Sequence, residues 1–167
     1  AARRAAEIVM ANQADCVICA GPAGDAEWDR VQVWEDALWR LTVSLSAEVP
    51  GFAYLEPKRH VPHVADLDGD EAASFGPILA RCTRILRAAT GAEVVYVYIF
   101  GDGIPHLHVH LAPHRQGDAL NDQFVRGEIV EEKLPGGMTR VLSKEFPPLP
   151  REDQLRVAEQ VRQRMAD

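Results

Sequence analysis

His106-Leu107-His108-Val109-His110-Leu111-Ala112 is the stretch that decides the fold of this chain, because polar and apolar side chains alternate along it. Successive side chains of an extended strand point to opposite faces, so the spacing predicts a strand with three imidazoles on one face. Imidazole titrates near neutral pH, and a row of three suits proton transfer, nucleophilic attack or metal binding. This strand is therefore the first candidate for a functional site.

The sequence around this strand predicts an antiparallel sheet. Valine and tyrosine dominate Val94 to Phe100, which predicts a strand, and Gly101-Asp102-Gly103 predicts the turn into the histidine strand. Alternating or apolar runs bounded by turn residues predict further strands. These are expected at Val31–Trp34, Leu38–Val43 and Gly51–Glu56.

Helical periodicity is clearest after the third of these strands. From Asp68 apolar residues recur at helical spacing until Gly91 ends the pattern, which predicts one long helix packed on the sheet. Arg3 to about Gln13 is also compatible with a helix. After Arg115 the chain is rich in turn residues until a last helix from about Arg151 to Met165, and we expect this tail to be an appendage.

Length and composition predict one domain over residues 1–167, and the expected strands and helices make it α+β, with a C-terminal helical extension at about 116–167. The net charge of -7, with no run of Lys or Arg, argues against long nucleic acid as a partner. No stretch approaches the roughly 20 apolar residues of a membrane span, and the amino terminus lacks a secretory apolar core. We expect a cytoplasmic protein that acts on a small molecule.

Cys16 and Cys19 form a C-x-x-C pair, which Gly21-Pro22-Ala23-Gly24 follows as an expected loop. Three cysteines are an odd number and fit a reducing compartment better than a disulfide framework. The pair alone leaves three readings open, namely metal ligands, a redox pair or two small buried residues. Cys82 lies in the helical pattern and is expected in the core.

Three segments together resemble the histidine triad (HIT) superfamily. Its signature His-φ-His-φ-His-φ-φ, with φ apolar, is matched at all seven positions of 106–112, and Pro113 follows as is usual in the family. Cys16-Val17-Ile18-Cys19 and Glu56-Pro57-Lys58-Arg59-His60-Val61 agree in order and spacing, and the second segment is similar to the P-K-x-H element of the family. The resemblance covers roughly residues 14–115 and implies a HIT-like antiparallel sheet of about five strands.

The resemblance implies a nucleotide hydrolase or nucleotidyl transferase that forms a nucleotidyl-histidine intermediate. Its substrate would be a nucleoside phosphoramidate, a dinucleoside polyphosphate or a related phosphoanhydride. His108, with one ring nitrogen bonded to backbone, would attack phosphorus, and His110 would assist the leaving group. Two alternatives remain open: a non-hydrolytic zinc-containing ligand-binding or regulatory protein, and a HIT-fold enzyme recruited to a different biosynthetic reaction.

Other interpretations of the histidine row also remain open at this stage. All three imidazoles could share a catalytic metal, or they could be plain half-exposed strand residues. Zinc-bearing members of the family instead imply a structural zinc on Cys16, Cys19, His60 and His106. His63, three residues after His60, is an alternative ligand or a partner of one.

The expected substrate contacts depart from the family pattern. Ser44, with Val43 as the alternative, stands where nucleotide-handling members carry an acidic residue that holds ribose hydroxyls. Asp102 and Gly103 replace the Gly-Gln-Ser or Gly-Gln-Thr whose side chains contact phosphate. A carboxylate there would repel an anion, although backbone N–H groups of a glycine turn still bind phosphate oxygens.

Two further residues are candidate substrate contacts. His114 stands where Arg is common and shares strand parity with the triad, but Pro113 is expected to break the strand before it. Trp34 lies on the first hairpin, where the family places a nucleobase pocket, with cross-strand packing as the alternative. The resemblance also implies a homodimer formed beside the long helix and the sheet.

Overall fold

The computed structural model describes residues 15–100, 104–118, 128–144 and 146–167, so the expected helix at Arg3–Gln13 and the turn at 101–103 lie outside the described residues. Its centre is a five-stranded antiparallel sheet in the order β1-β2-β3-β5-β4. The strands are β1 (Arg30–Glu35), β2 (Trp39–Ser44), β3 (Ala53–Pro57), β4 (Val94–Tyr98) and β5 (Val109–His114). The predicted α+β class with about five strands is confirmed.

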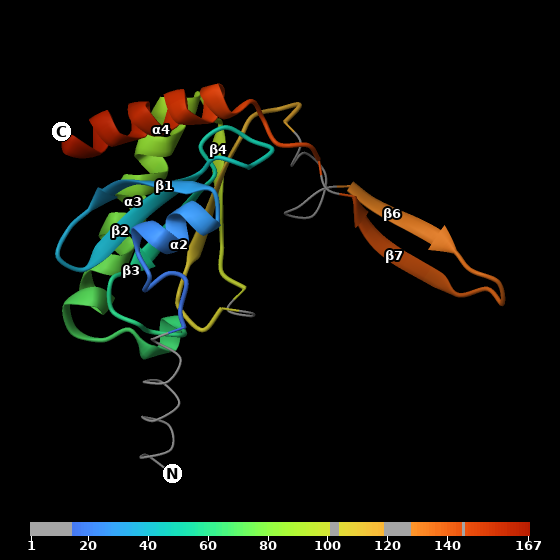
Figure 1. The fold of residues 1–167 in the computed structure, drawn as a ribbon, viewed down its shortest axis with the longest axis horizontal. Helices are drawn as coiled ribbons and strands as arrows, with labels where there is room; N and C mark the ends of the chain where they lie inside the picture. The colour runs from blue at the N-terminus through green and yellow to red at the C-terminus, as the bar shows by residue number, and fades with distance from the viewer. Residues whose placement is uncertain (1–14, 101–103, 119–127, 145) are drawn as a thin grey trace, which may run out of the picture.

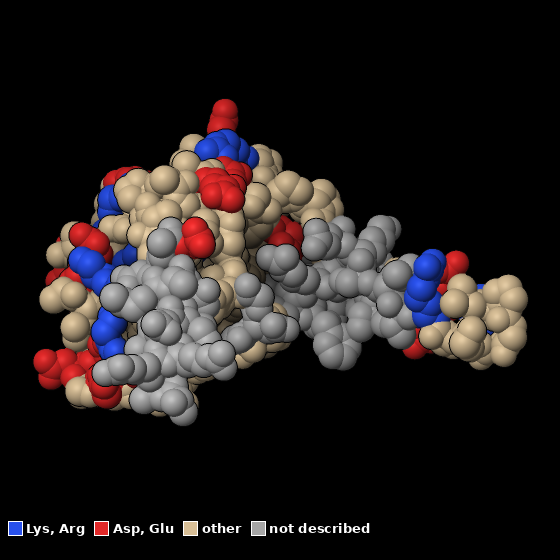
Figure 2. All heavy atoms as spheres, turned by 60° about the horizontal axis from the view of Figure 1, so that its bottom comes forward, with Lys and Arg blue, Asp and Glu red and all other residues tan. Residues whose placement is uncertain are grey.

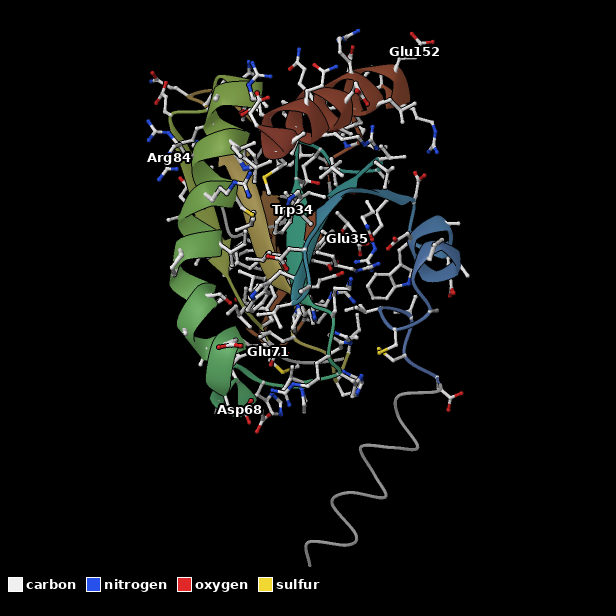
Figure 3. All side chains as sticks on the ribbon, turned by 90° about the vertical axis from the view of Figure 1, so that its left-hand side faces the viewer. Trp34, Glu35, Asp68, Glu71, Arg84 and Glu152 are labelled. Carbon is white, nitrogen blue, oxygen red and sulfur yellow. The ribbon has the colours of Figure 1, made fainter. Side chains whose placement is uncertain are left out.

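The helices lie on both sides of this sheet (Figures 1 and 3). The long helix α3 (Gly69–Thr90) covers one face, and α4 (Arg151–Ala166) packs across α3 and beside β1. The short helix α2 (Pro22–Glu27) lies on the opposite face, next to β1. A single 3-10 turn (Val64–Asp66) precedes α3, which ends at Gly91 as predicted, with the left-handed φ of 71° that glycine tolerates.

The main core lies between the sheet and α3. Alternate residues of β2 (Trp39, Leu41 and Val43) are fully buried and meet Cys82 and Leu86 of α3. The last helix joins the same core through an apolar stripe, which consists of Ala158, Val161 and Met165. The expectation that the tail is an appendage is therefore wrong for α4.

The opposite face of the sheet is polar and nevertheless buried. Arg40, Thr42 and Ser44 alternate with the core residues of β2, and Tyr54 and Glu56 lie beside them on β3 in register. All except the partly buried Tyr54 are less than 9% exposed. A buried polar face needs internal partners, so this side of the sheet is where a functional site is expected.

The histidine strand differs from its prediction at both ends. The ladder of β5 begins only at Val109, and Leu107 is held before it by a backbone hydrogen bond to the Val61 carbonyl at 2.6 Å. Pro113 does not break the strand: it is the register partner of Val95 on β4, at a point where pairing with β3 has ended, so its missing N–H costs no bond to β3. The His114 carbonyl accepts from Glu93 N at 2.9 Å, so β5 continues to His114.

One helix and one hairpin were not predicted. The Gly-Pro segment after Cys19 forms α2 and not a loop, because Pro22 at the first helical position already has helical φ and needs no amide partner. Inside the extension, β6 (Glu128–Lys133) and β7 (Thr139–Lys144) form a separate hairpin, which lies apart from the sheet in Figure 1. Neither strand alternates clearly, because β6 ends in the charged run Glu131-Glu132-Lys133 and β7 has Val141 and Leu142 side by side, so the sequence pattern does not reveal them.

The described surface carries charges of both signs. Figure 2 shows acidic and basic side chains interleaved on the viewed face, without an extended basic area among the described residues. None of the described helices has both the length and the apolar character that a membrane span requires. Asp68 and Glu71 lie together at the start of α3 (Figure 3), where both accept from Arg59.

Candidate active site and metal centre

A pocket of about 470 Å³ lies on the polar face of the sheet and contains two of the three histidines. This volume suits a small-molecule ligand. Aromatic, hydroxyl and carboxylate side chains line it. The lining residues are Trp28, Ser44, Ser46, Ala47, Glu48, Phe52, Tyr54, Ile104, His108, His110, Phe146 and Pro148.

His108 is oriented by its own backbone. Its Nδ1 donates a hydrogen bond to the carbonyl oxygen of His106 at 2.7 Å, and its side chain is buried. Because Nδ1 then carries the proton, the neutral ring has its lone pair on Nε2. An imidazole held in this way has one nitrogen free to attack an electrophile in the pocket.

His110 lies beside His108, with 5.1 Å between the ring centroids. Its ring stacks on Tyr98 at 4.6 Å and meets Tyr54 edge-on at 5.2 Å. Tyr54 is also its register partner across β3 and β5. The aromatic cage fixes the plane of the His110 ring against the pocket, where an imidazole can exchange a proton with a bound group.

The third histidine of the row belongs to a different cluster. Cys16, Cys19, His60 and His106 come from three distant parts of the chain, and their ligand atoms all lie within 4.8 Å of one another. The Cys19 Sγ lies 3.3 Å from His60 Nδ1 and 3.4 Å from His106 Nδ1. Cys16 Sγ lies 3.5 Å from His106 Nδ1.

These four donors fit a tetrahedral zinc ion. Two thiolates and two imidazoles are a common structural zinc set, and bonds of about 2.3 Å to sulfur and about 2.0 Å to nitrogen separate ligand atoms by roughly 3.3 to 3.8 Å. The separations from 3.3 to 3.5 Å agree with this arrangement. His106 Nε2 donates to the Pro57 carbonyl at 2.8 Å, which leaves Nδ1 directed at the cysteines.

In the metal-free protein, burial shifts the pKa values of two of these donors. It lowers the pKa of His106 to about 4, despite the bond to Pro57, so the ring is neutral at neutral pH and Nδ1 is available. Burial, with the neighbouring Cys16, raises the pKa of the Cys19 thiol to about 12. His63 is exposed and lies outside this cluster, whereas His60 is buried within it.

A sequence profile described as HIT domain matches residues 25–117, which is more than half of the chain. The chain belongs to the HIT domain family. An uncharacterized HIT-like protein of Mycobacterium tuberculosis is 30% identical over 136 residues, which cover 71% of this chain and 92% of that relative. A bis(5'-adenosyl)-triphosphatase of Dictyostelium discoideum is 26% identical over 98 residues, covering 56% of this chain and 66% of the relative.

A solved structure shares this HIT fold over most of its length. It is described as a Zn-bound histidine triad family protein from Mycobacterium smegmatis and is 20% identical, with a TM-score of 0.63. The match covers 92% of this chain and 97% of the other. At this identity the likeness establishes the fold.

Of the described residues expected to contact the substrate, one lines the pocket and another does not. Ser44 lines the pocket, whereas Asp102 and Gly103 lie outside the described residues. His114 is buried against Tyr96, with ring centroids 5.2 Å apart, and is not among the pocket residues. These positions agree with a site centred on His108 and not on the far end of β5.

Trp34 does not lie in the pocket. A bulge at Val33 shifts the register between β1 and β2, so that Trp34 pairs with Leu41 of the core face. The Trp34 ring lies 5.6 Å below the guanidinium of Arg81 from α3. Trp28, which precedes β1, lines the pocket in its place.

The sequence did reveal a signal for the aromatic residues that were missed. Phe52 and Tyr54 alternate along the strand expected at 51–56, and Tyr54 faces His110 across the sheet. Alternation alone places both on one face, but only the strand order brings that face against β5. The contributions of Phe146 and Pro148 had no comparable signal.

A buried ring of four charges lies on the same face of the sheet. Asp25 of α2 and Glu56 of β3 each contact both Arg30 and Arg40 at 2.6 to 2.8 Å. Burial alone lowers the pKa of Arg40, but the charges of Glu56 and Asp25 outweigh it and raise the pKa. The Arg30 guanidinium also lies over the aromatic rings of Trp28 and Tyr54. Through Arg30, the four buried charges therefore pack directly against two residues that line the pocket.

Proposed function

We propose that this HIT protein is a nucleotide hydrolase or nucleotidyl transferase that uses His108 as a covalent nucleophile. The observation that carries the proposal is the hydrogen bond from His108 Nδ1 to the His106 carbonyl, within a pocket of nucleotide size. The substrate is a nucleoside phosphoramidate, a dinucleoside polyphosphate or a related phosphoanhydride. The Dictyostelium relative, described as a bis(5'-adenosyl)-triphosphatase, supports this substrate class.

The reaction has two displacements at one phosphorus. His108 Nε2 forms a bond to the phosphorus that carries the nucleoside, and the bond from that phosphorus to its amine or phosphate leaving group breaks. His110, 5.1 Å from His108, provides the proton that the leaving group takes up. Water or another acceptor then attacks the nucleotidyl-His108, gives its proton to His110 and restores the free imidazole.

We infer that Cys16, Cys19, His60 and His106 hold a structural zinc. The bound ion would fasten the cysteine loop to the segment just before β5. His106 then acts through backbone, because its carbonyl is the acceptor that fixes His108. The metal and the nucleophile are thus joined by one residue.

The test is covalent trapping with a panel of phosphate-labelled nucleotides, followed by mapping of the label. We expect acid-labile label on His108, and we expect His108→Ala to lose label and turnover while zinc content is unchanged. His63→Ala is the matched control, because His63 is an exposed histidine outside both clusters.

Three results would contradict the proposal. Full activity of His108→Ala excludes it as the nucleophile. Binding without any covalent or hydrolytic product across the panel would favour the ligand-binding alternative. A product in which the bond between the nucleoside-bearing phosphorus and its leaving group is intact would favour a different reaction catalysed by the same histidines.

We also propose a homodimer formed through β4 and α3. β4 is an outer strand of the sheet, and Val94, Tyr96 and Val97 are 43 to 46% exposed. An exposed apolar edge strand of this kind tends to pair with another chain, and a second copy of this protein would bury it. Sedimentation should show a dimer that Val97→Lys dissociates; a wild-type monomer at micromolar concentration would contradict it. The cytoplasmic location stays a prediction.

A further inference from the structure

The C-terminal extension supplies one wall of the pocket, and none of the chemistry proposed above uses it. Phe146 and Pro148 line the same cavity as His108 and His110. Both lie beyond residue 117, where the match to the HIT domain ends. The pocket of this protein is therefore completed by residues outside the matched domain.

A single buried side chain connects the extension to the turn after β2. Gln154 of α4 is 0% exposed, and its Nε2 donates to the carbonyl oxygens of Ala47 at 2.9 Å and Val49 at 3.1 Å. Its Oε1 accepts from Gly51 N at 3.3 Å. One amide thus serves the backbone groups of three buried residues of this turn, and such groups are costly to leave without partners.

The same turn forms a second wall of the pocket. Ser46, Ala47 and Glu48 line the cavity, and the Ala47 carbonyl also accepts from Leu149 N at 2.9 Å. Ala47 therefore receives two hydrogen bonds from the extension. The turn and the segment that carries Phe146 are held to each other directly.

The turn also has little room to move. Gly51 has a φ of 74°, and a Cβ added there would lie 2.8 Å from Thr90 Cγ2 and 3.1 Å from Val157 Cγ1. It is therefore seated against both α3 and α4. The core contacts of α4 fix the position of Gln154. Gln154 in turn fixes the turn that lines the pocket.

We propose that Gln154 is a positioning residue for the substrate pocket, and that Phe146 is a specificity-determining residue that contacts the nucleoside end of the substrate. This rests on the proposed nucleotide activity. With the phosphorus at His108, the rest of the cavity offers the rings of Trp28, Phe52 and Phe146 to a planar base. Ser46 and Glu48, which Gln154 holds in place through the turn, offer acceptors to hydroxyl or amino groups.

The test uses the full-length protein, with AMP as the binding probe in calorimetry and adenosine 5'-phosphoramidate as the substrate. Loss of one base-stacking ring in Phe146→Ala should weaken AMP binding and raise KM by about tenfold, since such contacts contribute about 1–3 kcal/mol. Its kcat should stay within about threefold, because His108 and His110 are unchanged. Gln154→Leu should give the same split between KM and kcat, measured below its melting temperature.

Matched controls separate these effects from general damage to α4. Leu155→Ala and Gln163→Leu change exposed residues of the same helix and should leave AMP affinity unchanged. Wild-type turnover together with unchanged AMP affinity in Phe146→Ala and Gln154→Leu overturns the proposal and leaves the hydrolase standing. If AMP binding depends on Phe146 but the protein shows no turnover, the proposed role of Phe146 is supported and the proposed hydrolase activity is contradicted. Phe146 is only partly buried, so its variant remains informative if Gln154→Leu fails to fold.

Discussion

Arg40 stands between two carboxylates from different elements, Asp25 of α2 and Glu56 of β3. Its guanidinium has fixed, planar donors, which suit this bidentate role better than an ammonium would. Glu56 precedes Pro57, whose carbonyl orients His106. The buried charges are thus linked through Pro57 to His106 of the proposed metal site.

Removal of one charge from this ring should destabilise the protein strongly. Asp25→Asn keeps the shape of the side chain but leaves Arg30 and Arg40 with one carboxylate between them. We expect a loss of about 3 kcal/mol in the free energy of unfolding, measured by urea denaturation.

Glu132→Gln is the control for this substitution, because Glu132 pairs with Arg140 at the surface of the β6–β7 hairpin. An exposed pair contributes little, and we expect a change of less than about 1 kcal/mol. Equal effects of the two substitutions would mean that burial of the ring does not determine its contribution.

At the scale of elements, α2 is packed so closely on the cysteine loop that only glycine fits at the contact. A Cβ added to Gly24 would lie 1.8 Å from the carbonyl oxygen of Val17, between the two cysteines. Gly24→Ala should therefore displace Cys16 or Cys19. We expect it to weaken zinc retention at least about tenfold in a chelator competition, as loss of support around metal ligands does.

Gly76→Ala is the matched control. Gly76 is also a helical glycine, but a Cβ there would meet nothing within 4 Å. Alanine has the higher helix propensity, so this variant should keep its zinc and gain up to about 1 kcal/mol of stability. Zinc loss that is equal in both variants would contradict the role given to the α2 contact.

The elements differ in how far the sequence predicts them. The histidine strand, the long helix and the first three strands follow from local periodicity, which any strand or helix must show. The sequence left two positions open for Trp34, because a one-residue bulge reverses the face of the residues that follow it and leaves no pattern in the sequence. The cluster of His60 with the cysteines was predicted only through the family resemblance, since spacing alone does not state which strand ends meet.

The last helix illustrates a signal that was present but not used. Gln154 continues the buried stripe of Ala158, Val161 and Met165 toward the start of α4. A polar residue at a core position of an amphipathic helix indicates a buried partner. Its partners lie more than 100 residues away, so the sequence could indicate that they exist but not what they are.

For the whole molecule, the proposed zinc should contribute to thermal stability. Metal that binds only the folded chain stabilises it by about 2.7 kcal/mol at a hundredfold excess over Kd, so chelation should lower Tm by about 5 to 10 °C. Scanning calorimetry of the loaded protein with and without chelator measures this shift. His63→Ala should respond as the wild type does, whereas a shift retained in Cys19→Ser would contradict the ligand set.

The four proposed metal ligands are spread over 90 residues of sequence. In the unfolded chain, a metal bound to Cys16 and Cys19 alone would still need two long loops to close before His60 and His106 arrive, and each closure costs entropy. The complete donor set thus exists only once β3 and β5 are paired. Because this pairing is non-local, we expect it to form late in folding. We expect zinc to be captured by an already assembled sheet, so zinc present during refolding should change the refolding rate less than it changes the unfolding rate and the final stability.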